Sequence, residues 1–229
     1  MFAHDRPVSA LIFDMDGTMI DSMGYHAQSW VEFTRRHGIA IEVADLMRRT
    51  TGRTGAECMV ELFGRPISID ESRELIAEKE SIYRTLFSPA FREVAGFTAF
   101  ANSALQRGLK VGVGTAGDRH NIEFAMTRLQ LPFALHAVVG GDEGFAGKPE
   151  PAIFLEAARR LQVKPEACIV FEDAPLGVEA ARRAGMRAVA LCTSHSADQL
   201  AGAHVSHTVP DFNALFTNGF LEKLNVVTS

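Results

Sequence analysis

The chain has 229 residues, of which 47% are hydrophobic, enough for one α/β domain with a small insertion around a normal core. Its formal net charge of −5 argues against general binding to a phosphate backbone, which usually requires a basic domain or stripe. No stretch approaches the roughly 18 consecutive apolar residues of a membrane span, so we expect neither a nucleic-acid nor a membrane partner.

The cysteines and the N-terminal residues bear on the cellular location of the protein. Cys58, Cys168 and Cys192 are odd in number and far apart in the sequence, which favours free thiols over a disulfide framework. Residues 1–17 show no charged region leading into a long apolar run, so they lack the pattern of a secretory signal. We therefore expect a cytoplasmic protein, and we expect it to be a monomer.

In chain order, the first predicted element is a strand over residues 8–14, "VSALIFD", an apolar run rich in β-branched residues. No convincing strand follows until about residue 93. Helical spacing in this interval covers residues 25–38, 55–64 and 70–87. The sequence "SIDE" predicts a capping box at the start of the last helix, with Ser68 as the cap and Glu71 reaching back. A helical stretch inserted directly after the first strand predicts a separate all-helical subdomain.

The rest of the chain alternates between strand and helix patterns. Apolar runs predict strands over residues 109–115, 134–140, 167–173 and 186–192. Helical spacing covers residues 118–130, 149–162 and 174–185. Strand, helix, strand in this order predicts a Rossmann-like three-layer α/β/α core with a parallel sheet, an α/β fold that also carries the inserted helical cap. We expect residues 1–20 and 93–229 to form the core and residues 21–92 to form the cap, with short hinges between them.

Polar residues stand where the predicted strands end. Asp14 and Asp16 end the first strand, Thr115 ends the second, and Glu172 and Asp173 end the fourth. Ligands of an open parallel sheet bind outside the carboxyl ends of its strands. Four carboxylates that converge there raise one another's pKa unless a cation lies among them. All the donors are hard oxygens without a cysteine or histidine beside them, so the sequence favours Mg²⁺ over zinc.

The remaining polar residues fit a phosphate bound at this metal. Lys148, in the loop sequence "GKPEP", supplies a point charge, and Thr115 supplies a hydroxyl. If one aspartate attacks phosphorus, the leaving alkoxide needs a proton, which a second carboxyl group near the metal can deliver before it deprotonates water. Gly17 permits the backbone to curl so that Asp14 and Asp16, two positions apart, face the same side.

Four segments together resemble the ordered motifs of the haloacid dehalogenase superfamily. They are "DMDGT" (14–18), "GVGTAGD" (112–118), "GKPEP" (147–151) and "FEDAPLGVEAA" (171–181). The resemblance extends from Val8 to about Cys192, and the helical insertion is similar to the first cap type of that superfamily. The most similar subgroup contains β-phosphoglucomutase and its sugar-phosphate phosphatase relatives.

The resemblance implies a role for each residue of the core motifs. Asp14 is expected to be the nucleophile and a metal ligand, and Asp16 the general acid/base, with its carbonyl on Mg²⁺. The residues expected on the phosphate are Thr115, Ala116 and Lys148. Asp173 is expected to be a further metal ligand, with Glu172 in support. Gly117 stands where the superfamily often has serine or asparagine, which leaves the phosphate a contact with backbone N–H alone.

Three cap residues match positions that this subgroup often uses. His26 lies near the first hinge, Lys79 is expected to face the core, and Arg53 is expected to correspond to a phosphate-binding arginine of the mutase. His26 and Lys79 also have an alternative role in the sequence itself. His26 stands on a helix with Tyr25 and Trp30 and fits a packing residue equally well. Lys79 lies in "EKE", which fits a solvated helix face.

We expect a Mg²⁺-dependent phosphatase that hydrolyses small sugar or polyol phosphate monoesters through an aspartyl-phosphate on Asp14. Its partner is then a small phosphorylated metabolite. The main alternative is β-phosphoglucomutase, which shares the chemistry up to the aspartyl-phosphate, and a remote alternative is a non-catalytic binding protein with this fold. Asp16 argues against dehalogenation, which needs no acid for the leaving group, and against phosphonate cleavage through a lysine Schiff base.

Overall fold

A six-stranded sheet forms the centre of the protein, in a computed structural model that describes residues 6–50 and 53–227. All strand pairs are parallel and the strand order is β3-β2-β1-β4-β5-β6. The strands are β1 (Ala10–Phe13), β2 (Lys110–Gly114), β3 (Ala137–Val139), β4 (Cys168–Glu172), β5 (Arg187–Leu191) and β6 (Val205–Val209). Phe13 of β1 pairs with Val113 of β2 and Phe171 of β4, so these three strands end at the same edge of the sheet.

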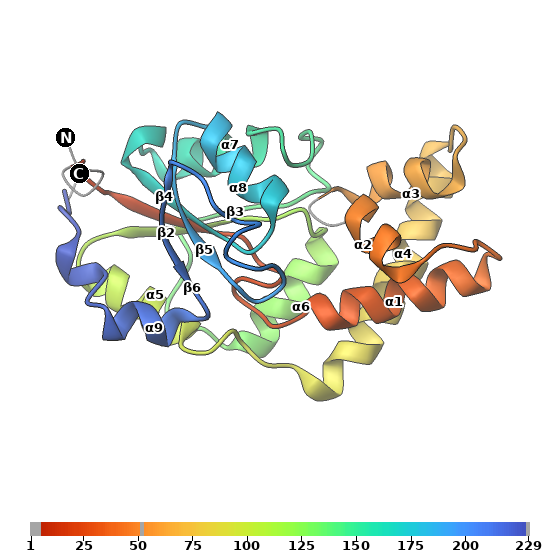
Figure 1. Ribbon diagram of the computed structural model, residues 1–229, viewed down its shortest axis with the longest axis horizontal. Coiled ribbons are helices and arrows are strands. Elements are labelled where there is room, and N and C mark those ends of the chain that lie inside the picture. Colours follow the sequence, from red (N-terminus) through yellow and green to blue (C-terminus); the bar gives the residue numbers. More distant parts are fainter. Residues whose placement is uncertain (1–5, 51–52, 228–229) are drawn as a thin grey trace.

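Helices cover both faces of the sheet and confirm the three-layer prediction (Figure 1). One face carries α7 (Ala152–Leu161) and α8 (Pro175–Arg183). The other face carries α5 (Phe97–Gln106), α6 (Arg119–Leu129) and α9 (Phe212–Thr217). Because both faces are buried, the central strands β1 and β4 are apolar over nearly their whole length instead of alternating with polar residues. In β1, for example, Leu11 and Phe13 pack on one side and Ala10 and Ile12 on the other.

Between β1 and α5, the described residues form four α-helices that make up a second unit, which we call the cap. They are α1 (Met23–Arg36), α2 (Val43–Thr50), α3 (Gly55–Phe63) and α4 (Ile69–Phe87). The cap lies beyond the end of the sheet (Figure 1) and has its own hydrophobic cluster around Trp30 and Phe33. The chain leaves the core and returns to it at adjacent points, since Ile20 and Glu93 form an antiparallel bridge.

The structure adds elements that the sequence patterns did not predict, and it corrects one prediction. The added elements are β6, α2, α5 and α9. The predicted capping box of α4 is only half formed: the Ser68 hydroxyl accepts from Glu71 N (3.2 Å), but the Glu71 carboxylate pairs with Arg65. A complete box lies instead at the start of α3, where Thr54 and Glu57 bind each other's backbone N–H.

Two further expectations concern the described residues as a whole. Within residues 6–50 and 53–227, no helix combines the length and the hydropathy needed to cross a bilayer. All three cysteines are free, as their number and spacing predict.

Phe212 tests whether α9 belongs to the core. Its fully buried ring packs against Phe13, Phe97, Phe100 and Phe171, so we expect Phe212→Ala to lower the free energy of unfolding by about 3–5 kcal/mol. Urea denaturation measures the change. Phe216→Ala, in the same helix but 40% exposed, is the control and should cost much less. Equal losses in the two variants would contradict this account of the core.

Candidate active site

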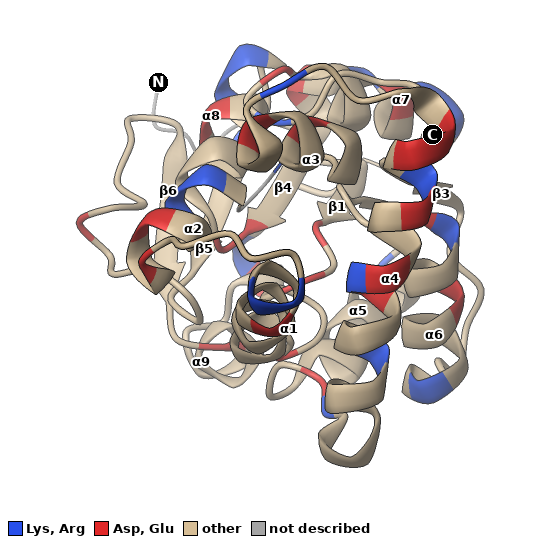
Figure 2. Ribbon diagram, turned by 90° about the vertical axis from the view of Figure 1, so that its right-hand side faces the viewer, with Lys and Arg blue, Asp and Glu red and all other residues tan. Residues whose placement is uncertain are grey.

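A cavity of about 1060 Å³ separates the cap from the carboxyl-end edge of the sheet. The structure brings every predicted site residue to its wall. From the core these are Asp14, Asp16, Thr115, Ala116, Lys148, Glu172 and Asp173, and from the cap His26, Arg53 and Lys79. In the end-on view of Figure 2, acidic segments at the ends of β1 and β4 are seen among the cap helices α1, α3 and α4. The cavity therefore lies where an open parallel sheet binds its ligands.

A tight turn explains why Asp14 and Asp16 share this cavity. Gly17 has φ +78°, a left-handed conformation that side chains disfavour, and its N–H donates to Ile20 O (2.8 Å). A Cβ atom at this position would lie 2.2 Å from Asp173 Oδ2. The turn thus requires glycine twice, for its backbone conformation and for the close approach of the Asp173 carboxylate.

The Lys148 ammonium joins two carboxylates at the floor of the cavity. Lys148 is only 3% exposed, and its Nζ donates to Asp14 Oδ1 (2.5 Å) and Glu172 Oε1 (2.6 Å). Burial lowers the pKa of Lys148, but Asp14 and Glu172 raise it above its ordinary value, so the ammonium stays charged. The second Glu172 oxygen accepts from the backbone N–H groups of Asp173 (2.9 Å) and Ala174 (2.8 Å). Both oxygens of Glu172 are therefore already used to accept hydrogen bonds within the site.

One lysine does not balance the negative charge at this floor. Burial raises the pKa of Asp14 to about 7, against the effect of Lys148. Burial, together with the charges of Glu172 and Asp14, raises the pKa of Asp173 well above its ordinary value. The Ser194 hydroxyl donates to the Asp173 carboxylate, which lowers its pKa only in part. Burial and the neighbouring carboxylates thus disfavour the ionised forms of Asp14 and Asp173, and a cation bound beside them would favour those forms.

A divalent cation fits this cluster. Asp14, Glu172 and Asp173 are all buried, and each offers a carboxylate oxygen within 4.8 Å of those of the others. Hard oxygens of this kind suit Mg²⁺, Ca²⁺ or Mn²⁺. Since Glu172 already accepts three hydrogen bonds, Asp14 and Asp173 have the freer oxygens for a metal.

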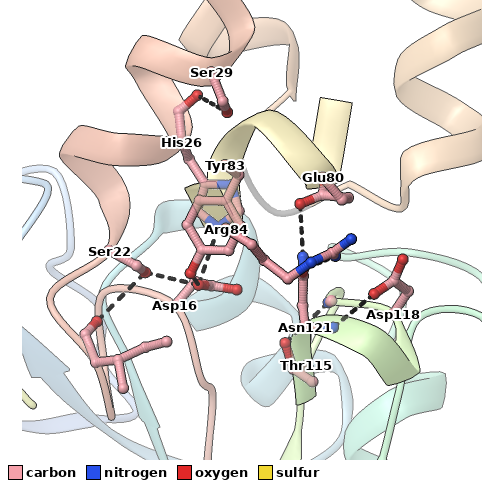
Figure 3. Close-up of polar contacts among 12 residues, drawn as sticks. Asp16, Ser22, His26, Ser29, Glu80, Tyr83, Arg84, Thr115, Asp118 and Asn121 are labelled. Carbon is pink, nitrogen blue, oxygen red and sulfur yellow. Dashed lines mark hydrogen bonds and ion pairs between the residues drawn. The ribbon is translucent and has the colours of Figure 1, made fainter. Parts of the chain in front are cut away.

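The Asp16 carboxylate faces the cap instead of this cluster (Figure 3). Its Oδ1 accepts from Ser22 Oγ (2.7 Å) and Tyr83 OH (3.2 Å), and His26 Nε2 lies 3.0 Å away. Burial acts to raise the pKa of Asp16, but the interaction with His26, the hydrogen bond from Ser22 and the charge of Lys79 outweigh it and lower the pKa to about 2. The pKa values of these two aspartates of one short segment are thus shifted in opposite directions.

His26 and Lys79 form a pair behind Asp16. Lys79 Nζ lies 2.8 Å from His26 Nδ1, and because an ammonium can only donate, Nδ1 accepts. The ring proton is therefore on Nε2, the atom that faces Asp16. Lys79 is only 2% exposed, so the alternative of a solvated helix face is wrong. His26 does also pack, stacked on the Tyr83 ring at 3.8 Å between centroids.

The other predicted residues lie around the wall. Thr115 is buried at the end of β2, and its hydroxyl accepts from Gly117 N (3.0 Å). Ala116 is half-buried beside it. Arg53 stands farther out on the cap, with its side chain 41% exposed and 3.7 Å from Glu61.

Several contacts of the site were not predicted from the sequence. Ser22 and Tyr83 bind Asp16, and Ser194 binds Asp173. Tyr83 carried a usable signal, since it follows Lys79 by four positions and therefore shares its helix face. Ser22 and Ser194 lie in short polar segments whose letters contain no comparable signal.

Comparison with known proteins places this geometry in a family. The model of the haloacid dehalogenase-like hydrolases matches residues 8–185, so the chain belongs to that family and is an enzyme. It is 36% identical to the validoxylamine A 7′-phosphate phosphatase of Streptomyces hygroscopicus subsp. limoneus, over 85% of this chain and 90% of that protein. It is 31% identical to the β-phosphoglucomutase of Bacillus subtilis, over 80% and 82%. A β-phosphoglucomutase structure from Clostridium difficile shares the fold, with a TM-score of 0.80, 24% identity, and coverage of 94% of this chain and 96% of that one.

Gly177 tests the packing that holds Glu172. A Cβ atom there would lie 1.7 Å from Glu172 Oε1, so we expect Gly177→Ala to displace the carboxylate and lower the free energy of unfolding by about 1–3 kcal/mol. Gly24→Ala is the matched control, because Gly24 is also helical and has nothing within 4 Å of its added Cβ. It should stabilise the protein by up to about 1 kcal/mol. Chemical denaturation of both variants decides, and a stable Gly177→Ala would refute the packing described.

Proposed function

We propose that the protein is a Mg²⁺-dependent phosphatase that hydrolyses small sugar or polyol phosphate monoesters through an aspartyl-phosphate on Asp14. The observation that carries this proposal is the contrast between the two aspartates. Asp14 accepts a hydrogen bond from Lys148 at the floor of the cavity, and Asp16 faces the cap residue His26. The family assignment supports phosphoryl chemistry for this pair.

In the first half-reaction an Asp14 oxygen attacks phosphorus and the bond from phosphorus to the ester oxygen breaks. The leaving oxygen takes a proton from Asp16. Asp16 must therefore bind a proton before this step, although its pKa in the free protein is about 2. A substrate phosphate dianion beside it favours the protonated form, because a neighbouring like charge raises a carboxyl pKa. Lys148, Thr115 and the backbone N–H groups around Ala116 hold the phosphoryl oxygens.

In the second half-reaction Asp16, now ionised, takes a proton from water. The water oxygen attacks phosphorus, the bond from phosphorus to Asp14 breaks, and inorganic phosphate leaves. The low pKa of Asp16 suits this step, because the carboxylate is its ordinary state. His26, with its proton on the nitrogen that faces Asp16, stabilises that carboxylate.

Asp14 and Asp173, with the Asp16 carbonyl, are proposed to hold Mg²⁺, and Glu172 supports them. A divalent cation bound there would favour the ionised forms of these carboxyl groups and would offset the charge of the phosphoryl group.

The substrate class is proposed from the relatives and the cavity. The relative with 36% identity is named for a phosphatase of a phosphorylated metabolite. A cavity of about 1060 Å³ admits a phosphate ester with a sizeable leaving group, since ligand sites commonly occupy about 300–1,000 Å³. We place substrate choice in cap residues such as Arg53 and Lys79. We also propose residues 21–92 as the cap domain of a cytoplasmic monomer.

The mutase stays the second candidate because one relative carries that name at 31% identity. It would use the same aspartyl-phosphate and pass the phosphoryl group back to another hydroxyl of a hexose phosphate. Incubation with β-glucose 1-phosphate and a trace of the bisphosphate separates the two candidates: glucose 6-phosphate appearing ahead of free phosphate would favour the mutase.

The proposed nucleophile is tested with a panel of sugar and polyol phosphates in the presence of Mg²⁺. We expect phosphate release from a subset of the panel, and a loss of at least about 10³-fold in kcat for Asp14→Asn, since an amide cannot attack phosphorus. Asp142→Asn, an exposed residue of the same cavity wall, is the matched control and should keep its activity. Unchanged turnover in Asp14→Asn would sink the proposal.

The proposed metal site is tested independently of catalytic activity, by measuring thermal unfolding at increasing Mg²⁺ concentrations. Binding to the folded state alone stabilises a protein by about 2.7 kcal/mol at a hundredfold excess over Kd, so Tm should rise. Asp173→Asn should remove most of this rise, and Asp142→Asn should keep it. A full Mg²⁺ effect on Asp173→Asn would move the metal away from this cluster.

A further inference from the structure

Asn121 joins the core to the cap, although it belongs neither to the four core motifs nor to the cap residues identified in the sequence. The residue lies in the first turn of α6, is 2% exposed, and its backbone N–H donates to the N-cap residue Asp118 (2.9 Å). Its side-chain Nδ2 donates to Glu80 Oε2 (2.6 Å), and its Oδ1 accepts from Arg84 (2.7 Å). Both partners belong to the cap helix α4 and stand one turn apart, so a single amide is hydrogen-bonded to two successive turns of that helix (Figure 3).

The charges of the two partners fix the direction of this amide. Glu80 can only accept, since its pKa is lowered by Lys79 and His26 despite its burial, and Arg84 can only donate. The amide therefore turns its NH₂ towards Glu80 and its oxygen towards Arg84. Aspartate, with nearly the same shape, would place a carboxylate against Glu80. The position thus needs an amide for its chemistry as well as its size.

A continuous series of contacts leads from Asn121 to Asp16. The second oxygen of Glu80 accepts from Lys79 Nζ (2.9 Å), Lys79 Nζ reaches His26 Nδ1 (2.8 Å), and His26 Nε2 faces Asp16 Oδ1 (3.0 Å). Every member of this series is buried or half-buried, so the contacts are little screened by water. The series crosses between cap and core at both ends, and it can form only when the cap lies against the core.

We propose that Asn121 is a positioning residue that clamps Glu80 and Arg84 of the closed cap and thereby holds Lys79 and His26 against Asp16. This inference rests on the proposed function, because it assigns Asn121 to the acid/base half of that reaction. Asn121 touches no reacting atom. It acts by setting where the Lys79 ammonium stands when the cavity is closed.

The clamp is tested by reversing its polarity. In Asn121→Asp the new carboxylate still accepts from Arg84 but repels Glu80, and we expect kcat/KM to fall about tenfold or more. Glu80→Gln in the same chain restores the match, because the new amide can donate to that carboxylate while its oxygen accepts from Lys79. The double variant should recover to within about threefold of the wild type. The proposal would be overturned if the double variant had a kcat/KM no higher than that of the worse single variant, as expected when the two effects are independent.

The only tryptophan of the chain gives a second readout that does not need activity. Lys79 Nζ lies over the Trp30 ring, 4.7 Å from its centroid, so Trp30 emission reports the position of this ammonium. We expect a shifted emission in Asn121→Asp and a return to the wild-type spectrum in the double variant. Unchanged emission and unchanged kcat/KM in Asn121→Asp would refute the clamp.

Controls separate the clamp from a loss of folding and from failure of the proposed function. Glu123→Gln with Asn218→Asp makes the same two chemical changes at exposed positions and should leave both readouts unchanged. If Asn121→Asp does not fold, Asn121→Ser, which is uncharged and smaller, must show the same emission shift. If the wild type releases no phosphate, the proposed function fails, and the Trp30 readout alone decides on the clamp.

Discussion

The ammonium group of Lys148, buried between Asp14 and Glu172, is the interaction on which the rest of the site depends. Two carboxylates at the ends of neighbouring strands repel each other in a low-dielectric environment, and a single cation of fixed position removes that repulsion. Glu172 uses its second oxygen to bind the next two backbone N–H groups and so fixes the loop that carries Asp173. Three buried carboxylates, those of Asp14, Glu172 and Asp173, share this one ammonium, and the cluster fits the proposed divalent cation.

Asp16 connects this floor to the cap. Its neighbour Asp14 belongs to the core cluster, whereas its own oxygen accepts from Ser22, directly before α1, and from Tyr83 on α4. In the proposed function, a movement of the cap would change the surroundings of Asp16, the proposed acid/base, while Asp14 would keep its partners in the core. A lid that brings proton-transfer groups into place in this way couples chemistry to the exclusion of water.

Sequence patterns predicted those parts of the protein that depend on local order. Asp14, Thr115 and Asp173 could be placed together because parallel strands end at one edge, whatever the details of the loops. The edge strand β6 was missed because its residues are mostly half-buried and polar, so no apolar run marks it. The partners Tyr83 and Asn121 come from a cap helix and a core helix, and single-chain patterns do not encode the angle between cap and core. Most of the missed contacts lie where cap and core meet, and the contact of Ser194 with Asp173 joins two loops of the core.

The most direct test of the account is to look for phosphate on Asp14 itself. Asp16→Asn should keep the nucleophile and its lysine but lack the base that activates water, so the covalent intermediate should accumulate. After mixing with a substrate of good leaving group, mass spectrometry should find one added phosphoryl group on the peptide that contains Asp14, and none after Asp14→Asn is added to the same chain. Phosphate release by the wild type without any phosphoryl group on Asp14, or with the group on another residue, would contradict the account.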